Sequence, residues 1–253
     1  MIITGISDTH NKHKQLMADL PGGDLIIHAG DFTSIGRKRE IQEFIKWFGG
    51  LNNYTHKVFI AGNHDLQFDS EKLHTTKASW FDKKVLDDGV EGKPDWLVDL
   101  LGELPSNTHY LENSSVEIDG VKIWGSPHTP AFGMGWGFNV ERGYPINQIW
   151  NTIPEDTDIV ITHGPMEFHC DLVRGWENVG CKELFNNMSK VKPHLHFCGH
   201  IHDSYGYRHI VGSDNWGNAY TFNVAVLNDD YSYRYKPVTL DYDFSSREFD
   251  FKM

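Results

Sequence analysis

Short apolar segments with many β-branched residues recur along the first quarter of the chain. They are Ile2–Ser7, Asp24–Ala29 and Lys57–Ala61, and each leads into a glycine or a polar cluster. Short runs of this kind, bounded by turn-forming residues, are typical of strands that are buried on both faces. The sequence therefore predicts three buried strands before residue 62.

An amphipathic helix is predicted between the second and third of these strands. Its apolar residues recur at positions i, i+3, i+4 and i+7, and they are Ile41, Phe44, Ile45 and Phe48. This spacing places them on one face of a helix, and Gly49-Gly50 follows, where glycine favours the helix end. A strand, a helix and a second strand in this order predict an α/β fold with parallel strands.

A hairpin adds antiparallel pairing further along the chain. Val116–Ile118 and Val121–Ile123 flank Asp119-Gly120, and Asp-Gly between two apolar segments is a strong signal for a tight hairpin turn. The sheet is therefore expected to be mixed.

Strand and helix signals continue nearly to the end of the chain. Strands are predicted at Asp158–Thr162, Leu195–Cys198, Ala219–Val226 and Val238–Tyr242, and a helix at Lys182–Val191. Residues 66–102 are mixed and charged, and helical pieces are indicated by their large apolar residues: Trp80, Phe81, Trp96, Leu97, Leu100 and Leu101. No repeat or Pro/Ser-rich linker interrupts the chain, so we expect one domain over residues 1–253.

The composition is that of an ordinary globular protein and narrows the choice of partners. The 253 residues, 39% of them hydrophobic, are enough to bury a core without disulfide or metal support. Lys plus Arg number 23 against 35 Asp plus Glu, and the resulting charge of −12 disfavours long nucleic acids as partners. No apolar stretch reaches the ~20 residues that span a bilayer, and turn signals come too early for a signal peptide. We expect a soluble chain with no membrane partner.

Cysteine and histidine usage indicates where chemistry is to be sought. Cys170, Cys181 and Cys198 are odd in number and form no C-x-x-C pair, which fits a reducing cytoplasm better than a disulfide framework. The 15 histidines stand out, because imidazole is a common metal ligand and titrates near neutral pH.

Five short polar clusters each follow one of the predicted strands, where open α/β sheets place their ligands. They are Asp8-Thr-His10, Gly30-Asp31, Gly62-Asn-His-Asp65, Thr162-His163-Gly164 and Gly199-His-Ile-His202. In an extended chain residues i and i+2 point the same way, so Asp8 with His10, and His200 with His202, can each offer two ligands to one place. The glycines permit the close backbone approach that a buried ion site needs.

These clusters supply oxygen and imidazole donors and no thiolate. The expected metal ligands are Asp8, His10, Asp31, Asn63, His163, His200 and His202. Such a set suits manganese, iron, zinc or nickel, and we expect two divalent ions, manganese first, with Asp31 spanning both. Because only two of these ligands are anionic, two such ions would leave the pocket positive inside an acidic protein.

Two other interpretations of the same regions remain open. The segment His194-Leu-His-Phe-Cys-Gly-His-Ile-His202 has polar atoms at every even position, so it could instead form a single short metal-binding tract. A turn at Gly199 should, however, divide this segment into two halves. The glycine-rich segment 133–137 has aromatic neighbours, which form either a lip over a nucleobase or a packed loop: Phe132, Trp136, Phe138 and Tyr144.

The order D-x-H, G-D, G-N-H-D, H-G and G-H-x-H resembles the signature of the calcineurin-like metallophosphoesterases over residues 8–202. Longer sequence segments resemble those of the small subfamily of metallophosphoesterase-domain-containing proteins. They are His28-Ala-Gly-Asp31-Phe-Thr, Ile60-Ala-Gly-Asn-His-Asp65, Gly125-Ser-Pro-His-Thr-Pro130, Gly135-Trp-Gly-Phe-Asn139 and Gly180-Cys-Lys-Glu-Leu184. The resemblance implies a four-layer αββα sandwich of two mixed sheets flanked by helices.

The resemblance also implies how the ligands divide between two metals. Asp8, His10, Asp31 and His202 would hold the first, and Asp31, Asn63, His163 and His200 the second. Some vertebrate members of the subfamily have glycine at the first histidine of G-H-x-H and are weak enzymes. His200 is present here, so a complete site is implied.

The expected chemistry is attack of a metal-bridging hydroxide on phosphorus. His64, adjacent to Asn63 but pointing elsewhere, is the candidate to steady the phosphoryl group or to protonate the leaving oxygen, with Asp65 fixing its tautomer. Asn63, His64, Trp136 and Asn139 are the expected substrate contacts, with Arg142 as a further candidate.

We therefore expect a phosphodiesterase acting on cyclic nucleotides or other small phosphodiesters. A protein phosphatase or other phosphomonoesterase is the alternative, although Gly30-Asp31 lacks the Asp-Arg-Gly continuation of the protein phosphatases. A weakly active nucleotide-binding module on the same fold is a further alternative, but such proteins usually lose ligands that are all present here. The oligomeric state is left open.

Overall fold

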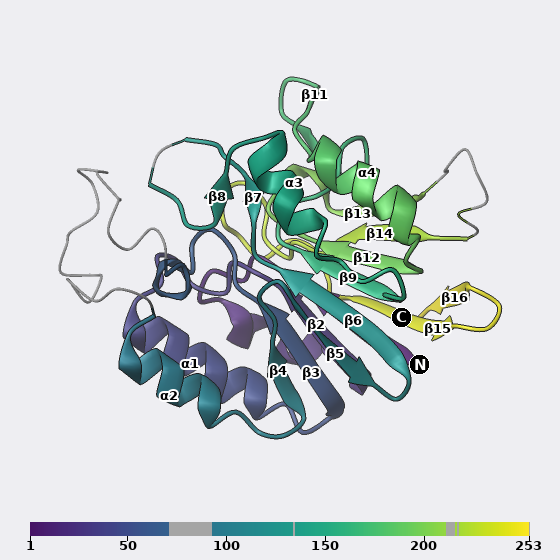
Figure 1. Ribbon diagram of the computed structural model, residues 1–253. Helices are drawn as coiled ribbons and strands as arrows, with labels where there is room; N and C mark the ends of the chain where they lie inside the picture. The colour runs from purple at the N-terminus through teal and green to yellow at the C-terminus, as the bar shows by residue number, and fades with distance from the viewer. Residues whose placement is uncertain (71–92, 134, 211–215, 217, 253) are drawn as a thin grey trace.

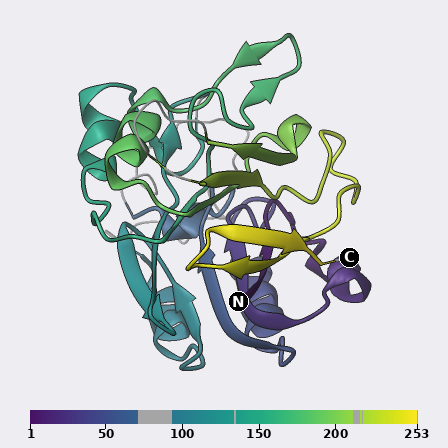
Figure 2. The same cartoon turned by 90° about the vertical axis from the view of Figure 1, so that its right-hand side faces the viewer.

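Two six-stranded β-sheets pack face to face in the computed structural model (Figure 1). The structure describes residues 1–70, 93–133, 135–210, 216 and 218–252. In sheet order, the first sheet consists of β16 (Glu248–Phe251), β15 (Val238–Asp243), β1 (Ile2–Ile6), β2 (Gly23–Ala29), β3 (Tyr54–Ile60) and β4 (Thr108–Tyr110). Strands β1 to β4 are parallel, and the antiparallel pair β15-β16 extends the sheet beyond β1 (Figure 2).

The second sheet is also mixed. In order, it consists of β13 (Gly206–His209), β14 (Tyr220–Asn223), β12 (Leu195–Cys198), β9 (Ile159–Thr162), β6 (Val121–Ser126) and β5 (Ser114–Ile118). Its four central strands are parallel, whereas β13 and β5 are antiparallel edges. The β5-β6 hairpin turns at Asp119 and Gly120 with φ values of 52° and 80°, as the Asp-Gly signal predicts.

Both faces of each central strand are buried, which explains why these segments are nearly continuously apolar. In β2, Leu25 and Ile27 point into the core between the two sheets, and Ile26 points to the outer face. In β9, Ile159 and Ile161 enter the same central core, while Val160 faces outward. This alternation is the period-two pattern of a strand with apolar partners on each side.

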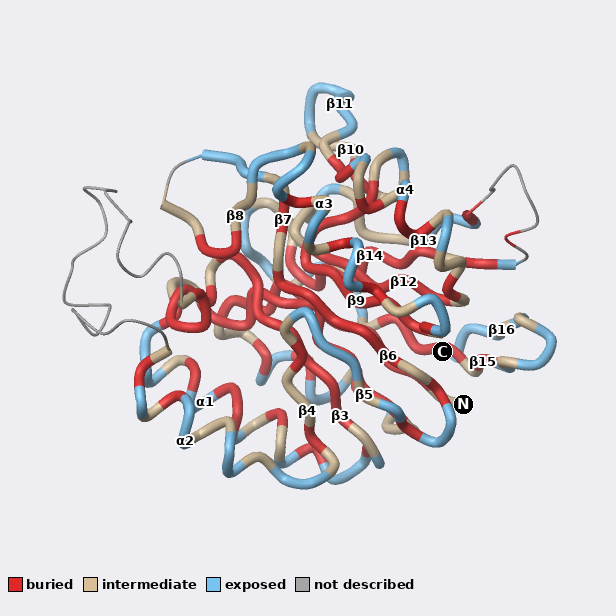
Figure 3. Tube along the Cα trace, viewed as in Figure 1, coloured by how far each residue is buried: buried red, intermediate tan, exposed pale blue. Residues whose placement is uncertain are grey.

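Helices cover the two outer faces and complete four αββα layers (Figures 1 and 3). Helices α1 (Lys38–Gly49) and α2 (Asp95–Gly102) lie on the first sheet, and α3 (Tyr144–Trp150) and α4 (Lys182–Val191) on the second. The four apolar residues predicted to share one face of α1 are all buried: Ile41, Phe44, Ile45 and Phe48. The layered architecture implied by the resemblance is confirmed.

Short elements connect these layers. They are β7 (Thr129–Pro130), β8 (Asn139–Val140), β10 (Leu172–Val173), β11 (Glu177–Asn178) and 3₁₀ turns at His13–Asp19, Leu66–Phe68 and His202–Ser204. Sequence patterns did not predict α3, β4, β13 or β16, and they made β14 too long. The helical pieces predicted around Trp80 and Phe81 lie outside the described residues. Among the residues that the structure describes, no helix has the length and apolar character needed to cross a membrane.

Candidate metal centre

The five polar clusters meet where the parallel strands of both sheets end. Ser7, just after β1, pairs with Ala225 beyond β14, and the amide of Asp8 donates to the carbonyl of Gly30 at 2.9 Å. The amide of Gly199 donates to the carbonyl of His163, also at 2.9 Å. These backbone contacts connect the ends of the strands and bring together residues far apart in the sequence.

Four of the predicted ligands have a left-handed backbone. The φ angle is 54° at Asp8, 37° at His10, 56° at Asp31 and 66° at His200. Such values are uncommon for residues other than glycine and persist where the surrounding structure fixes them. The expectation of extended i, i+2 pairs is therefore wrong: β1 ends at Ile6, and a turn instead brings Asp8 and His10 together.

Glycines at the site leave room that side chains of other residues fill. A Cβ on Gly199 would lie 2.1 Å from Oδ2 of Asp8, and one on Gly62 would lie 2.3 Å from Oδ1 of Asp31. Both distances are far below van der Waals contact. The close approach expected of these glycines is present, and it lets two carboxylates sit directly against the backbone.

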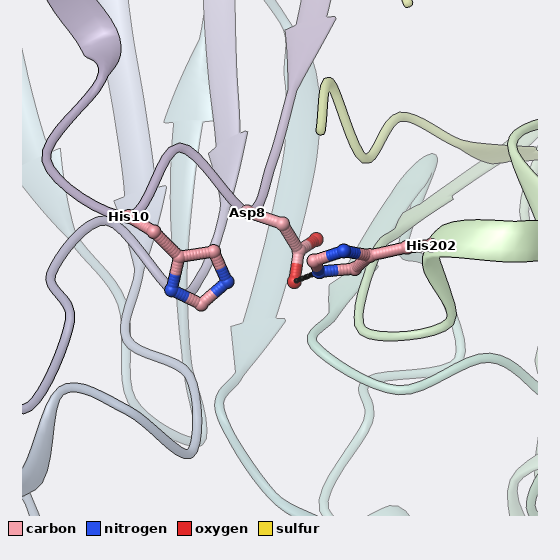
Figure 4. A group of neighbouring side chains, drawn as sticks. All are labelled: Asp8, His10 and His202. Carbon is pink, nitrogen blue, oxygen red and sulfur yellow. Dashed lines mark ion pairs between the residues drawn. The ribbon is translucent and has the colours of Figure 1, made fainter. Parts of the chain in front are cut away.

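The first group of donors consists of Asp8, His10 and His202, whose ligand atoms all lie within 4.8 Å of one another. Figure 4 shows the Asp8 carboxylate between the two imidazole rings, with an ion pair of 3.3 Å from its Oδ1 to Nε2 of His202. The backbone amide of His200 donates to the other oxygen at 2.9 Å. Asp8 is completely buried, so this carboxylate is held from several sides.

The second group consists of Asp31, His163 and His200, and it satisfies the same 4.8 Å limit. Nε2 of His163 lies 3.3 Å from Oδ2 of Asp31 and 3.0 Å from Oδ1 of Asn63. His200 and His202 thus belong to different groups, which corrects the expectation that they serve one place. The separation agrees with the division that the resemblance implies.

Asp31 lies between the groups. Its Oδ2 is 3.9 Å from Nε2 of His10 and 3.9 Å from Nε2 of His64, in addition to its contact with His163. His10, Asp31 and His64 form a third set of neighbouring donors. A carboxylate with imidazoles of both groups around one oxygen has the position that a bridging ligand requires.

Backbone carbonyls fix which nitrogen of each ring faces the site. Nδ1 of His10 donates to Thr33 O, Nδ1 of His163 donates to Ala29 O, and Nδ1 of His202 donates to Asn228 O, at 2.9 to 3.0 Å. A carbonyl can only accept, so the proton lies on Nδ1 and the lone pair of a neutral ring is on Nε2. This is the usual way in which proteins orient histidine ligands for a metal.

Buried polar atoms without hydrogen-bond partners support a metal at this place. Nε2 of His10 is buried and makes no hydrogen bond within the described chain, and Oδ1 of Asp8 has no hydrogen bond there beyond its ion pair with His202. Burying such atoms without a partner costs free energy. Their donor types and their proximity to the other ligands fit divalent cations, so the residues present suit the metal ions that the sequence predicts.

The electrostatics of these residues point to the same conclusion. Burial alone would raise the pKa of Asp31, but the charges of His163 and His64 outweigh it and hold that pKa well below its usual range. Burial lowers the pKa of His163 and of His202, but Asp31 and Asp8 respectively overcome this effect and raise each to about 9. The two buried carboxylates therefore need compensating positive charge, which protons supply in the metal-free chain.

His64 and Asp65 do not act on each other as predicted. Nδ1 of His64 donates to Ser34 O at 2.6 Å, and its Nε2 faces Asp31, so the ring points into the site rather than elsewhere. Asp65 instead accepts the amides of Asp31 and Thr33, at 2.9 Å each. Because Asp65 bonds to the loop that carries Asp31, it positions that loop and does not set the tautomer of His64.

The expected substrate contacts divide into two kinds. Trp136 lies against His64, with ring centroids 4.0 Å apart, and so borders the site. Asn139, the first residue of β8, donates to Phe132 O and accepts from the hydroxyl of Thr129, so it braces β8 against β7 and the loop between them. Arg142 donates to the carbonyls of Val179 and Gly180 and braces a neighbouring loop.

The aromatic residues around the glycine-rich segment differ in their distance from the site. Phe132 and Trp136 contact His200 and His64, whereas Phe138 is buried in the core and Tyr144 begins α3. Of the four aromatic residues, Phe132 and Trp136 therefore border the site.

In the histidine-rich tract, both ring nitrogens of His196 bond to threonine hydroxyls, those of Thr162 and Thr221. His196 is thus a satisfied core residue, and the tract is not a single metal site. His28 bonds to the hydroxyl of Thr9, between Asp8 and His10, so it lies beside the turn that carries these two residues.

Tyr231 is a residue at the site that sequence reasoning missed. Its ring lies 4.8 Å from that of His10 and 5.5 Å from that of His202. Burial, followed by the charges of Asp31 and Asp8, raises the pKa of Tyr231 above its usual value. No motif marks this tyrosine, because it reaches the centre through a loop after the last of the five clusters.

Comparisons with known proteins agree with this geometry. The sequence model of the family described as calcineurin-like phosphoesterase matches residues 1–204. The chain is 39% identical over 239 residues to metallophosphoesterase domain-containing protein 1 of Homo sapiens, and equally to that of Mus musculus, covering 93% of this chain and 69% of theirs. Among solved structures, the fold is similar to a phosphopantetheinyl hydrolase of Mycobacterium tuberculosis, with a TM-score of 0.50, 14% identity and 90% of each chain covered.

Proposed function

Because the chain belongs to the calcineurin-like phosphoesterase family, whose members depend on a dinuclear metal centre, we propose that it is a phosphodiesterase acting on small phosphodiesters such as cyclic nucleotides. The observation that carries the proposal is the position of Asp31, whose Oδ2 lies near imidazoles of both donor groups. One carboxylate between two groups of ligands fits a pair of divalent ions, and manganese is the metal that we favour.

The chain's own residues define what such a centre can do. Asp8, His10 and His202 would hold one ion, His163, His200 and Asn63 the other, and Asp31 both. Bound divalent ions supply Lewis acidity, lower the pKa of water and neutralise charge on a phosphoryl group. The Nδ1 hydrogen bonds to backbone carbonyls keep the imidazole ligands oriented, so little reorganisation is needed when substrate arrives.

His64 is proposed to act on the substrate and not to serve as a metal ligand. Its Nδ1 proton is bound to Ser34 O, and its Nε2 side is directed at Asp31 and bordered by Trp136. A ring fixed in this way can hold a phosphoryl oxygen or give a proton to the leaving oxygen when its Nε2 is protonated.

The proposed substrates are small because of the charge and shape of the surroundings. The net charge of −12 disfavours polyanions. The cavity beside His200 and His202 has a volume of about 310 Å³, at the lower end of pockets that hold small molecules, roughly 300–1,000 Å³.

A panel of substrates and metals tests the function. Purified protein would be stripped of metal, reloaded with manganese, nickel, zinc or iron, and assayed on p-nitrophenyl phosphate, its bis-ester, and 2′,3′- and 3′,5′-cyclic nucleotides. We expect hydrolysis of the diesters to exceed that of the monoester. Activity on the monoester alone would contradict the proposal, and two bound metals without any turnover would favour a binding module.

Replacing His64 by Ala should separate turnover from metal binding. We expect kcat on the preferred diester to fall about a hundredfold, because general acid or positioning groups typically contribute on that order, while metal content stays near that of the wild type. Steady-state kinetics and elemental analysis of the same samples measure both quantities. Loss of metal would instead identify His64 as a ligand.

A further inference from the structure

Three aromatic rings border the metal centre, each against a different histidine. Trp136 lies against His64, Phe132 lies 4.7 Å from His200, and Tyr231 lies against His10. The first two belong to the loop between β7 and β8, whereas Tyr231 comes from the loop after β14. Of the three, Tyr231 is the one with a hydroxyl group, so it differs from the others in what it can offer a polar substrate.

The backbone holds Tyr231 in an unfavourable conformation. Its φ is 56°, which is a genuine outlier for a bulky residue. The amide of Tyr231 donates to Asn228 O at 2.8 Å, and Nδ1 of His202 donates to the same carbonyl at 3.0 Å. One carbonyl therefore couples the position of Tyr231 to that of a proposed ligand, and strain of this kind concentrates where function requires it.

The ring stands at the open side of the centre. Tyr231 is 43% exposed and lines the 310 Å³ cavity together with His200 and His202. No hydrogen bond is made by its hydroxyl to any residue in the described part of the chain. The ring thus has neighbours on the protein side, and its hydroxyl is available to a molecule in the cavity.

Charges in the same cavity bear on where a phosphoryl group can lie. Arg174 lines the cavity, but its Nε is 3.4 Å from Asp203 and 3.1 Å from Asp229. Two carboxylates outweigh one guanidinium, so this ion-paired group does not offer a net positive charge to an anion. We therefore expect a phosphoryl group to lie beside the donor groups, next to His202 and Tyr231, rather than on Arg174.

We propose that Tyr231 is a substrate-binding residue whose hydroxyl donates a hydrogen bond to an oxygen of the phosphoryl group. This inference rests on the proposed function, since it takes a phosphoester as the occupant of the cavity. The phenol is a neutral donor near pH 7, and a hydrogen bond from it to an anionic oxygen is of the stronger, charge-assisted type.

The test compares two tyrosines of nearly equal exposure. Tyr231→Phe removes the hydroxyl and keeps the ring that packs on His10. Tyr207→Phe is the control, because Tyr207 is 45% exposed and packs on Phe222 and Phe251. Inorganic phosphate is titrated into the manganese-loaded proteins by calorimetry, kcat/KM is measured on bis-p-nitrophenyl phosphate, and metal content is determined for each sample.

We expect Tyr231→Phe to weaken phosphate binding and to lower kcat/KM, each about tenfold, with unchanged metal content and no effect of Tyr207→Phe. Wild-type values in Tyr231→Phe would overturn the inference, and so would a decrease that is accompanied by loss of metal. If the wild-type protein hydrolyses no phosphoester, the proposed function fails on its own account, and the phosphate titration still decides the role of Tyr231.

Discussion

Replacing Asp31 by Asn should reduce phosphoesterase activity by about a thousandfold or more, because the loss of the ligand that we propose to be common to two ions removes several kcal/mol of transition-state stabilisation. The change is isosteric, and Oδ1 of the new amide can still accept the amide of His64, which Asp31 now accepts at 2.8 Å. What disappears is the negative charge near the imidazoles of His10 and His163. Elemental analysis should show fewer than two metals per chain.

The matched control for this substitution is Asp171→Asn. Asp171 is 2% exposed, and Oδ2 of its carboxylate accepts the amides of Phe168 and Gly180, so it is a buried aspartate outside the donor groups. We expect the control to lose some stability but to retain metal and activity. An Asp31→Asn protein with two metals and near-normal turnover would refute the bridging role.

Replacing Gly199 by Ala should lower the free energy of unfolding by about 3 kcal/mol, the range of a severe overpacking substitution. The added Cβ would lie 2.1 Å from Oδ2 of Asp8 and 2.2 Å from Oγ of Ser7. Asp8 is fully buried and cannot move into solvent. Displacing its carboxylate also breaks the 2.9 Å hydrogen bond from the amide of His200, so metal affinity should fall as well.

Gly102→Ala provides the comparison for this steric effect. Gly102 is the last residue of α2, and a Cβ there would meet nothing within 4 Å. Neither glycine has a positive φ that alanine would strain. We expect the control to change stability by less than about 0.5 kcal/mol. Urea unfolding of the metal-free proteins measures both changes, and equal midpoints for Gly199→Ala and wild type would contradict the steric argument.

Local patterns predicted the buried elements well, for a physical reason. In α1 and β2, apolar residues occur at the positions whose side chains enter a buried layer, so their spacing along the sequence identifies the helix or the strand. Short or exposed edges such as β16 and β13 have few buried side chains. Their pairing depends on neighbours far along the chain, and no local period marks them.

The site residues likewise divide into those that a local motif predicts and those whose contacts depend on distant parts of the chain. Asp8, Asp31 and His163 could be recognised because each follows a predicted strand within a short motif. The sequence also indicated their donor chemistry. It did not indicate that Asp65 would bond to the loop of Asp31 instead of to His64, because that contact depends on how the loop after β2 folds back onto the turn after β3.

The sequence by itself determined a mixed α/β fold, the donor types and the glycines that leave room for them, since all of these follow from residue chemistry and short-range spacing. The four-layer arrangement was implied by the family resemblance and not by the spacing. Only the tertiary structure decided which carbonyl fixes each imidazole, that His64 points into the site and that Tyr231 borders the centre. Those features depend on left-handed turns and on contacts between separate loops, and such contacts exist only once the two sheets have packed together.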